Sequence, residues 1–203
     1  MTSSSERIKG TLLLSRLKFL RGKGEATLER VIATLPEQDQ RQLRGMILPS
    51  SWYPLELLRG LEGAMVAALS YGSRTELFLE MGRATATANL TGTGSQRVYV
   101  RPGDPHFLLR HSPYIYASSH TSGSRSYEST GEHSAVLRTT RPEVRREDCH
   151  TTLGWLRRAI EIAGGRDVRV VETRCGSEGA PHCEYRCEWR PGVTAAATNL
   201  SGG

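Results

Sequence analysis

Residues 170–189 have the sequence VVETRCGSEGAPHCEYRCEW. It begins with strand-forming residues, passes through a loop that contains Gly176, Gly179 and Pro181, and ends in a run where cysteines and aromatic residues alternate with charged ones. This pattern predicts a β-hairpin. Three of the four cysteines lie between 175 and 187, and in a reducing compartment such crowding favours thiolate metal ligands over disulfides.

The regions before the hairpin predict an α+β fold. Residues 147–165 have helical spacing, with Asp148 as the expected N-cap. Short segments rich in β-branched and aromatic residues predict antiparallel strands at 96–100, 114–120, 125–129 and 133–140. Helical patterns cover 26–35, 52–72 and 73–92, whereas 8–20 fits a strand or a helix. We therefore expect N-terminal helices, a central antiparallel sheet, and a C-terminal helix with a zinc-stapled β-hairpin.

Length and composition set the broad class. With 203 residues, we expect a single domain at 1–190 and a disordered, small and polar tail at 191–203. No signal peptide or membrane-length apolar run is present, which predicts a soluble cytoplasmic protein. The net charge of +6 is mostly scattered and no helix-turn-helix pattern accompanies it, so nucleic acid is not an expected partner. Hydrolase and nucleotide-binding motifs are also absent, and an enzyme is not expected.

The hairpin and the start of the preceding helix supply more metal-ligand candidates than a tetrahedral site needs. These candidates are Cys149, His150, Glu172, Cys175, His182, Cys183 and Cys187. Residues 172 and 175 point to opposite faces of a regular strand, so both can bind one metal only if the strand breaks near 173–174. Spacing alone leaves Cys187 as a rival to the other cysteines, because it shares a strand face with Cys183.

The order of four of these residues, C…E-x-x-C-x7-C, resembles the zinc site of the 4-vinyl reductase-type ligand-binding domain. That family includes phenol-sensing domains of bacterial transcription activators, and the resemblance extends over 147–189. The whole chain, with WYP at 52–54 and MGR at 81–83, is also similar to a paralogous family of myxobacterial proteins. Both share a broad fold with haem-nitric-oxide domains and Golgi tethering subunits. The resemblance implies one structural zinc bound by Cys149, Glu172, Cys175 and Cys183, with Cys187 as a bystander.

The resemblance also implies a small, largely apolar ligand inside the domain. Residues able to line such a pocket and orient a ligand are Trp52, His106, Phe107, Tyr114, Tyr116 and Trp155, with Tyr53 and His111 as further candidates. His106 is the most suggestive, because an imidazole can hydrogen-bond a phenolic or carboxylic ligand. Haem is not expected, since YESTG at 127–131 has Gly131 where the haem-nitric-oxide family has an arginine.

These inferences combine into one functional expectation. We expect a stand-alone sensory or adaptor domain with a structural zinc, which binds a small hydrophobic molecule and signals through a partner protein or by dimerising. A homodimer is expected because domains of this kind commonly pair. The alternative is a protein–protein interaction module of the same fold that binds no ligand.

Overall fold

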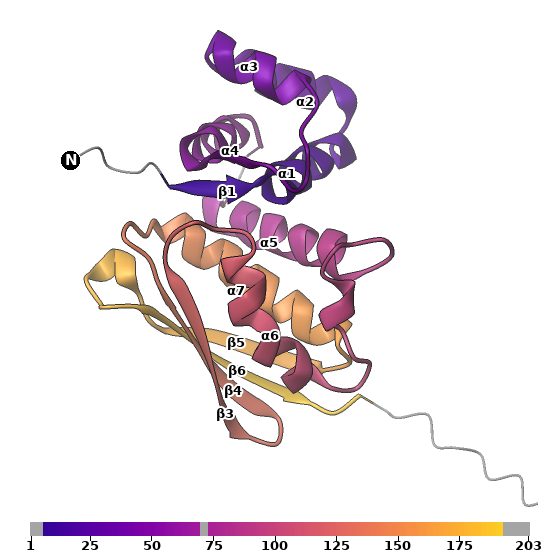
Figure 1. Cartoon of the computed structure of the whole chain (residues 1–203), viewed down its shortest axis with the longest axis vertical. Coiled ribbons are helices and arrows are strands. Elements are labelled where there is room, and N and C mark those ends of the chain that lie inside the picture. Colours follow the sequence, from indigo (N-terminus) through magenta and orange to yellow (C-terminus); the bar gives the residue numbers. More distant parts are fainter. Residues whose placement is uncertain (1–5, 70–72, 193–203) are drawn as a thin grey trace, which may run out of the picture.

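The computed structural model describes residues 6–69 and 73–192, and its class is α+β as predicted (Figure 1). The first layer is built from short helices and a small two-stranded sheet. Its elements are β1 (Arg7–Lys9), α1 (Gly10–Gly22), α2 (Glu25–Ala33), α3 (Glu37–Arg44), β2 (Trp52–Pro54) and α4 (Leu55–Leu69). The ambiguous segment 8–20 is mainly helical, because Leu13, Leu17 and Leu20 repeat with the helical period and are buried together.

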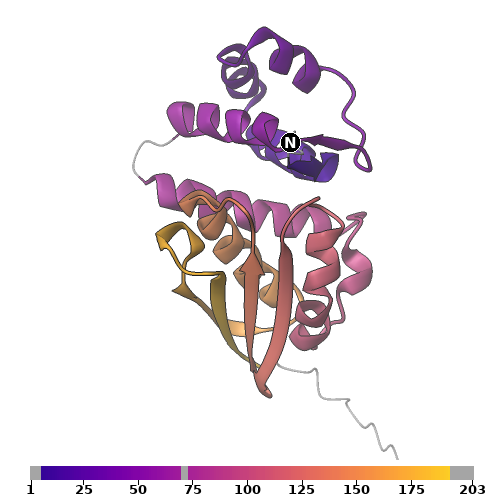
Figure 2. The same ribbon diagram turned by 60° about the vertical axis from the view of Figure 1, so that its left-hand side comes forward.

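The second layer places helices on one face of a four-stranded sheet (Figure 2). Its elements are α5 (Arg74–Leu90), α6 (Pro105–Ala117), β3 (Ser124–Gly131), β4 (Ser134–Thr140), α7 (Arg146–Ile162), β5 (Arg166–Arg174) and β6 (Cys183–Arg190). The strands are antiparallel in the order β3-β4-β6-β5. Alternate residues of β6 are buried under the helices, and the residues between them face outward. The sheet therefore presents one apolar face to α6 and α7.

Helix α5 joins the two layers. Its residues Leu77, Phe78 and Met81 belong to the apolar core of the N-terminal helices, whereas Ala86 and Leu90 belong to the core of the sheet layer. It crosses α7 closely, with Gly82 and Gly154 at the crossing. A Cβ atom at Gly82 would lie 2.8 Å from the backbone nitrogen of Trp155, and one at Gly154 would lie 2.9 Å from the carbonyl carbon of Leu79. Only glycine allows the two backbones to approach this closely.

Two of the four predicted strands were wrong. Residues 97–99 form one turn of 3-10 helix, and 114–120 contain the C-terminal part of α6. The start of α6 has clear helix signals: Asp104 is the N-cap and accepts a hydrogen bond from the backbone N–H of Phe107 at 2.8 Å, and Pro105 opens the first turn. Aromatic residues in its second half imitate a strand, but the buried positions of α6 follow the helical period.

Several boundaries also differ from expectation. The predicted helix at 52–72 begins at Leu55, after a short strand, and its residues 70–72 lie outside the described residues. Asp148 occupies the third position of α7 and accepts a hydrogen bond from the backbone N–H of Arg145, which is the N-cap residue. Strand β5 has a register shift between Glu172 and Arg174, which is the irregularity that Glu172 and Cys175 need if both are to bind one metal. Most of the expected tail, 193–203, lies outside the described residues.

Candidate functional site

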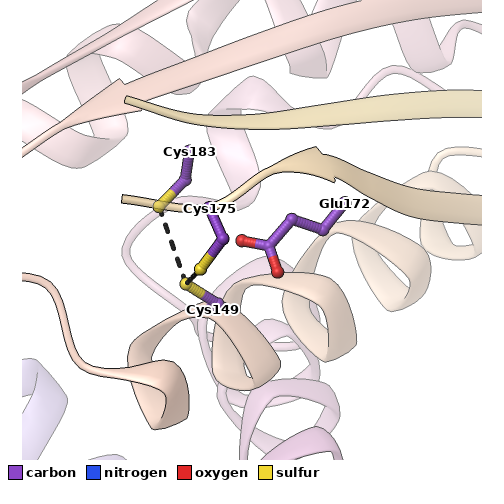
Figure 3. A group of neighbouring side chains, drawn as sticks. All are labelled: Cys149, Glu172, Cys175 and Cys183. Atoms are coloured by element: carbon purple, nitrogen blue, oxygen red, sulfur yellow. Dashed lines mark hydrogen bonds between the residues drawn. The ribbon is translucent and has the colours of Figure 1, made fainter. Parts of the chain in front are cut away.

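The first candidate site is a cluster of three cysteines and one glutamate. Cys149 comes from the first turns of α7, Glu172 from β5, Cys175 from the end of the hairpin loop next to β5, and Cys183 from the start of β6 (Figure 3). One ligand atom from each residue lies within 4.8 Å of all the others. The Cys149 Sγ atom is 3.6 Å from the Sγ atoms of both Cys175 and Cys183. Sulfurs bound tetrahedrally at about 2.3 Å from one zinc lie about 3.8 Å apart, so the spacing suits a metal.

The surroundings of the cluster also suit a cation. The side chain of Glu172 is buried, and its Oε2 atom pairs with Arg146 at 2.6 Å. Its Oε1 atom is buried and has no hydrogen-bond partner among the described residues. Figure 3 shows this carboxylate directed toward the sulfurs. A buried, unpaired carboxylate oxygen is costly unless a cation or donor satisfies it. The cluster therefore has the ligand types of a four-coordinate metal site, and it has a carboxylate oxygen that a bound cation would satisfy.

Hydrogen bonds around the sulfurs favour a thiolate at Cys183. The backbone N–H of Gly176 donates to the Cys183 Sγ atom at 3.2 Å. The pKa of Cys183 is lowered to about 6, mainly by the hydrogen bond with Cys149 and also by this backbone donor. The same pairing raises the pKa of the Cys149 thiol, since one proton is shared between the two sulfurs. The loop thus already stabilises the charged form that a metal requires.

The remaining candidate ligands lie outside the cluster. Cys187 is buried on the same face of β6 as Cys183, but its thiol is not part of the group, and burial raises its pKa to about 12. His182 lies beside Glu184, with 3.9 Å between Nε2 and the carboxylate. His150 also stands outside the group. Of the seven candidates from the sequence, the fold brings together the four that the resemblance to the 4-vinyl reductase-type domain selects.

The second candidate site is a cavity of about 130 Å³ between the N-terminal helices and the sheet layer. Apolar side chains from α1, α4, α6 and α7 form part of its wall, including Leu12, Leu55, Ile115 and Trp155. Cys149 and Cys183 also line it, so the cysteine cluster and the cavity share a wall. An apolar cavity of about 150 Å³ can hold a benzene molecule, so this space suits a small organic ligand.

Polar groups also face this cavity. They include Arg16, Glu62, Gln96, Tyr116, His120, Arg125, Arg141 and Asp148. Arg16 and Glu62 form a buried ion pair at 2.9 Å, and Asp148 lies 3.6 Å from Arg141. The cavity therefore combines an apolar wall with convergent polar groups, the usual composition of a small-molecule site.

His120 is the one histidine among the described residues that line the cavity. Its Nδ1–H donates to the Tyr116 carbonyl at 3.2 Å and its ring stacks on the Tyr116 ring, while Nε2 has no hydrogen bond among the described residues. Burial, reinforced by the nearby charge of Arg141, lowers the His120 pKa to about 3. The imidazole is therefore neutral at physiological pH, with Nε2 available to a ligand.

The lowered pKa of His120 predicts an acid-sensitive contribution to stability. Because the folded pKa lies below the ordinary value of 6.5, this contribution is complete above about pH 6.5 and is lost as the pH falls toward 3. The free energy of unfolding of a His120→Asn variant should fall less steeply below pH 6.5, by up to about 1.4 kcal/mol per pH unit. Urea unfolding across this pH range measures the slope. A His133→Asn variant serves as the control, and parallel curves for His120→Asn and the unmodified chain would contradict the assignment.

The ligand-binding residues expected from the sequence divide between the cavity and other places. Tyr116 and Trp155 line the cavity. The others do not line it. His106 forms a hydrogen bond with the Tyr127 hydroxyl at 2.7 Å, and Phe107 packs against His111. Trp52 lies against Lys9, and Tyr114 is exposed. Since α6 was read as a loop followed by a strand, residues of its outer face appeared to point inward.

Four residues that line the cavity were not predicted from the sequence: His120, Arg125, Arg141 and Gln96. Their positions carry no local motif, because they come from a helix end, two strand ends and a loop that only the tertiary fold brings together. One sequence feature could have predicted part of this site. It is an arginine at a strand position that should face the interior, as at Arg125.

Comparisons with known proteins give a family and a fold. Residues 50–190 match a protein family described as "Protein of unknown function (DUF2378)", and no curated protein matches the chain. An H-NOX protein from S. oneidensis in the Fe(II)NO ligation state is 14% identical, with a TM-score of 0.69 over 90% of this chain and 99% of that one. An oxygen-binding H-NOX domain related to soluble guanylate cyclases is 13% identical, with a TM-score of 0.68 over 95% and 100%. An H-NOX mutant from K. algicida is 14% identical, with a TM-score of 0.64 over 92% and 98%. At these identities the likeness shows the fold alone.

The expectation about haem is corrected by these neighbours. Structures of the same fold are described in terms of haem distortion and Fe(II) ligation states, so Gly131 in place of an arginine does not set haem aside. The physical reason is that arginines can line this cavity from positions other than 131, as Arg125 and Arg141 do, although the cavity of about 130 Å³ is much smaller than a haem.

Proposed function

The chain belongs to the DUF2378 family, and we propose that it is a sensory domain that binds a small molecule in the cavity between its N-terminal helices and its sheet layer. The observation that carries this proposal is the cavity of about 130 Å³, with an apolar wall and convergent polar groups. The H-NOX proteins of similar fold are described with nitric oxide or oxygen bound, which supports the same use of this fold here. The resemblance of residues 147–189 to the 4-vinyl reductase-type domain supports it independently.

The cysteine cluster forms the second part of the proposal. Cys149, Glu172, Cys175 and Cys183 bind one zinc ion, and the orphaned Glu172 Oε1 atom supports this set. Four protein ligands leave no open coordination position, so the metal has a structural role. The ion connects α7 to the hairpin and stabilises the part of the cavity wall that Cys149 and Cys183 form.

The position of the cavity between the two layers also explains how ligand binding is signalled in this proposal. Ligand binding changes the contacts between the N-terminal helices and the sheet layer, and a partner protein or a second copy of the chain reads this change. The single domain at 1–190 and the homodimer expected from the resemblance are part of this proposal, and light scattering of the purified chain checks the dimer. None of the described helices is long and apolar enough to cross a membrane.

A binding experiment with a blocked-cavity variant tests the proposed function. Benzyl alcohol matches the size of the cavity and carries no charge, and we expect it to perturb NMR signals of cavity-lining methyl groups. Leu58→Trp places a larger side chain in the wall and should abolish these shifts. A Val98→Trp variant, changed at an exposed position, is the control.

Binding of haem and the absence of any binding would lead to different conclusions. Haem is much larger than this cavity of about 130 Å³, so growth of haem absorbance on adding haem, lost on changing His120→Ala, would show that the cavity widens and would identify haem as the ligand class. If neither compound binds, the cavity is not a ligand site and the interaction module becomes the better account. Exposed Met46 and Leu48, in the loop between α3 and β2, would then be the first surface to test for a protein partner.

A further inference from the structure

The charges around the cavity do not balance. Its described lining residues include the arginines Arg16, Arg125 and Arg141 but only two carboxylates, Glu62 and Asp148. His120 does not change this difference, because its low pKa keeps it neutral. The arginines and carboxylates alone therefore leave one positive charge unmatched; the Cys183 sulfur also lines the cavity, but its hydrogen bonds are to Cys149 and Gly176 and not to Arg125.

Two of the three arginines have carboxylate partners. Arg16 pairs with Glu62 at 2.9 Å, and Arg141 pairs with Glu6 at 2.9 Å. Arg145, which lies behind the wall, pairs with Glu62 at 2.8 Å and is matched as well. The surplus positive charge thus belongs to Arg125.

Arg125 has no carboxylate partner within residues 6–69 and 73–192, and the other segments of the chain contain no Asp or Glu side chain. Its Nε–H donates to the Thr139 hydroxyl at 3.0 Å, and its guanidinium lies 5.2 Å from the centre of the Tyr116 ring. These contacts hold the side chain in place but do not neutralise it. Burial lowers the pKa of this guanidinium.

A second lining residue has an unmet polar group. Gln96 is buried, and its Oε1 atom has no hydrogen-bond partner in the part of the chain that the structure describes. Buried side-chain polar atoms in folded proteins are normally satisfied. Arg125 therefore lacks an anionic partner and the Gln96 Oε1 atom lacks a hydrogen-bond donor, and both side chains border the same space.

We infer that the ligand of this cavity carries a carboxylate or equivalent anionic group that binds Arg125, while its apolar part packs against Leu12, Leu55 and Ile115. This inference rests on the proposed function and specifies its ligand class. A guanidinium offers a carboxylate two parallel N–H donors, and the Nη groups of Arg125 are suited to this geometry. The cavity size limits the ligand to roughly a single ring or a short chain.

Calorimetric titration with a matched pair of probes tests the inference. Benzoate and benzyl alcohol have similar ring size, and only benzoate carries an anion. The unmodified chain should bind benzoate more tightly, and Arg125→Gln should raise the Kd of benzoate about tenfold or more while changing that of benzyl alcohol by less than about twofold. Arg186→Gln is the control, because Arg186 lies on the outward face of β6 and should leave both Kd values unchanged.

The outcomes separate the inference from the proposed function. Equal Kd values for the two probes, or an unchanged benzoate Kd in Arg125→Gln, would overturn the inference while leaving a cavity that still binds a neutral ring. Binding of neither probe would overturn both. If Arg125→Gln does not fold, Arg125→Lys keeps the charge without the planar fork, and its benzoate Kd should lie between those of benzyl alcohol and benzoate in the unmodified chain.

Discussion

A Cys183→Ser variant should lose the proposed zinc ion and much of the stability of the domain. The Cys183 sulfur belongs to the four-residue cluster and is the thiolate that Gly176 stabilises. Binding energies of structural zinc sites reach about 10–16 kcal/mol in small zinc domains, which exceeds the total stability of most folded domains. Elemental analysis and thermal unfolding of the purified variant measure the two losses.

Cys187→Ser is the matched control for this prediction. It replaces a buried thiol on the same strand face but outside the cluster, so it should keep one metal per chain and lose only about 1–3 kcal/mol from burying a hydroxyl. If Cys183→Ser cannot be purified, a chelator added to the unmodified chain should lower its unfolding temperature. Loss of metal from Cys187→Ser together with its retention in Cys149→Ser would show that the ligand set is wrong.

Gly154→Ala should destabilise the protein by at least about 3 kcal/mol. The added methyl group would meet the backbone carbonyl group of Leu79, and backbone cannot move aside as the end of a side chain can. Overpacking costs about 1–3 kcal/mol even where side chains can yield, so a clash between two helix backbones should cost at least the upper part of this range. Urea unfolding followed by circular dichroism measures the effect.

The same substitution at Gly63 provides the control. Gly63 lies on an exposed face of α4, and a Cβ atom there would have nothing within 4 Å among the described residues. Gly63→Ala should therefore raise the free energy of unfolding by about 0.5–1 kcal/mol through helix propensity. Similar effects at the two glycines would contradict the close crossing of α5 and α7.

The fold class was predictable from sequence because its signals are local. The hairpin at 170–189 alternates buried and exposed residues, and α7 repeats its apolar residues with the helical period. Helix α6 was not recognised because its aromatic residues and internal proline resemble a broken strand. Its N-cap and first-turn proline at 104–105 were the correct local signal.

The two parts of the candidate site differed in how much the sequence could predict. The proposed metal ligands lie near one hairpin and one helix start, so their order along the chain carries information, and the alternation rule indicated that two of them can share one metal only if β5 is irregular there. The cavity residues come from segments that are distant in sequence, and no spacing links His120, Arg125 and Gln96. Likewise, the glycine of MGR at 81–83 and the glycine at 154 are explained only by the structure, in which α5 and α7 cross closely at these two positions.

Native mass spectrometry of the chain, purified from its own host without chelators, tests whether the cavity holds a small molecule. We expect the native mass to exceed the denatured mass by one zinc ion and one small organic molecule per chain, and we expect Leu58→Trp to retain the zinc but not the organic molecule. A native mass with no organic adduct in the unmodified chain, or an adduct that persists in Leu58→Trp, would contradict the claim that this cavity binds the signal molecule.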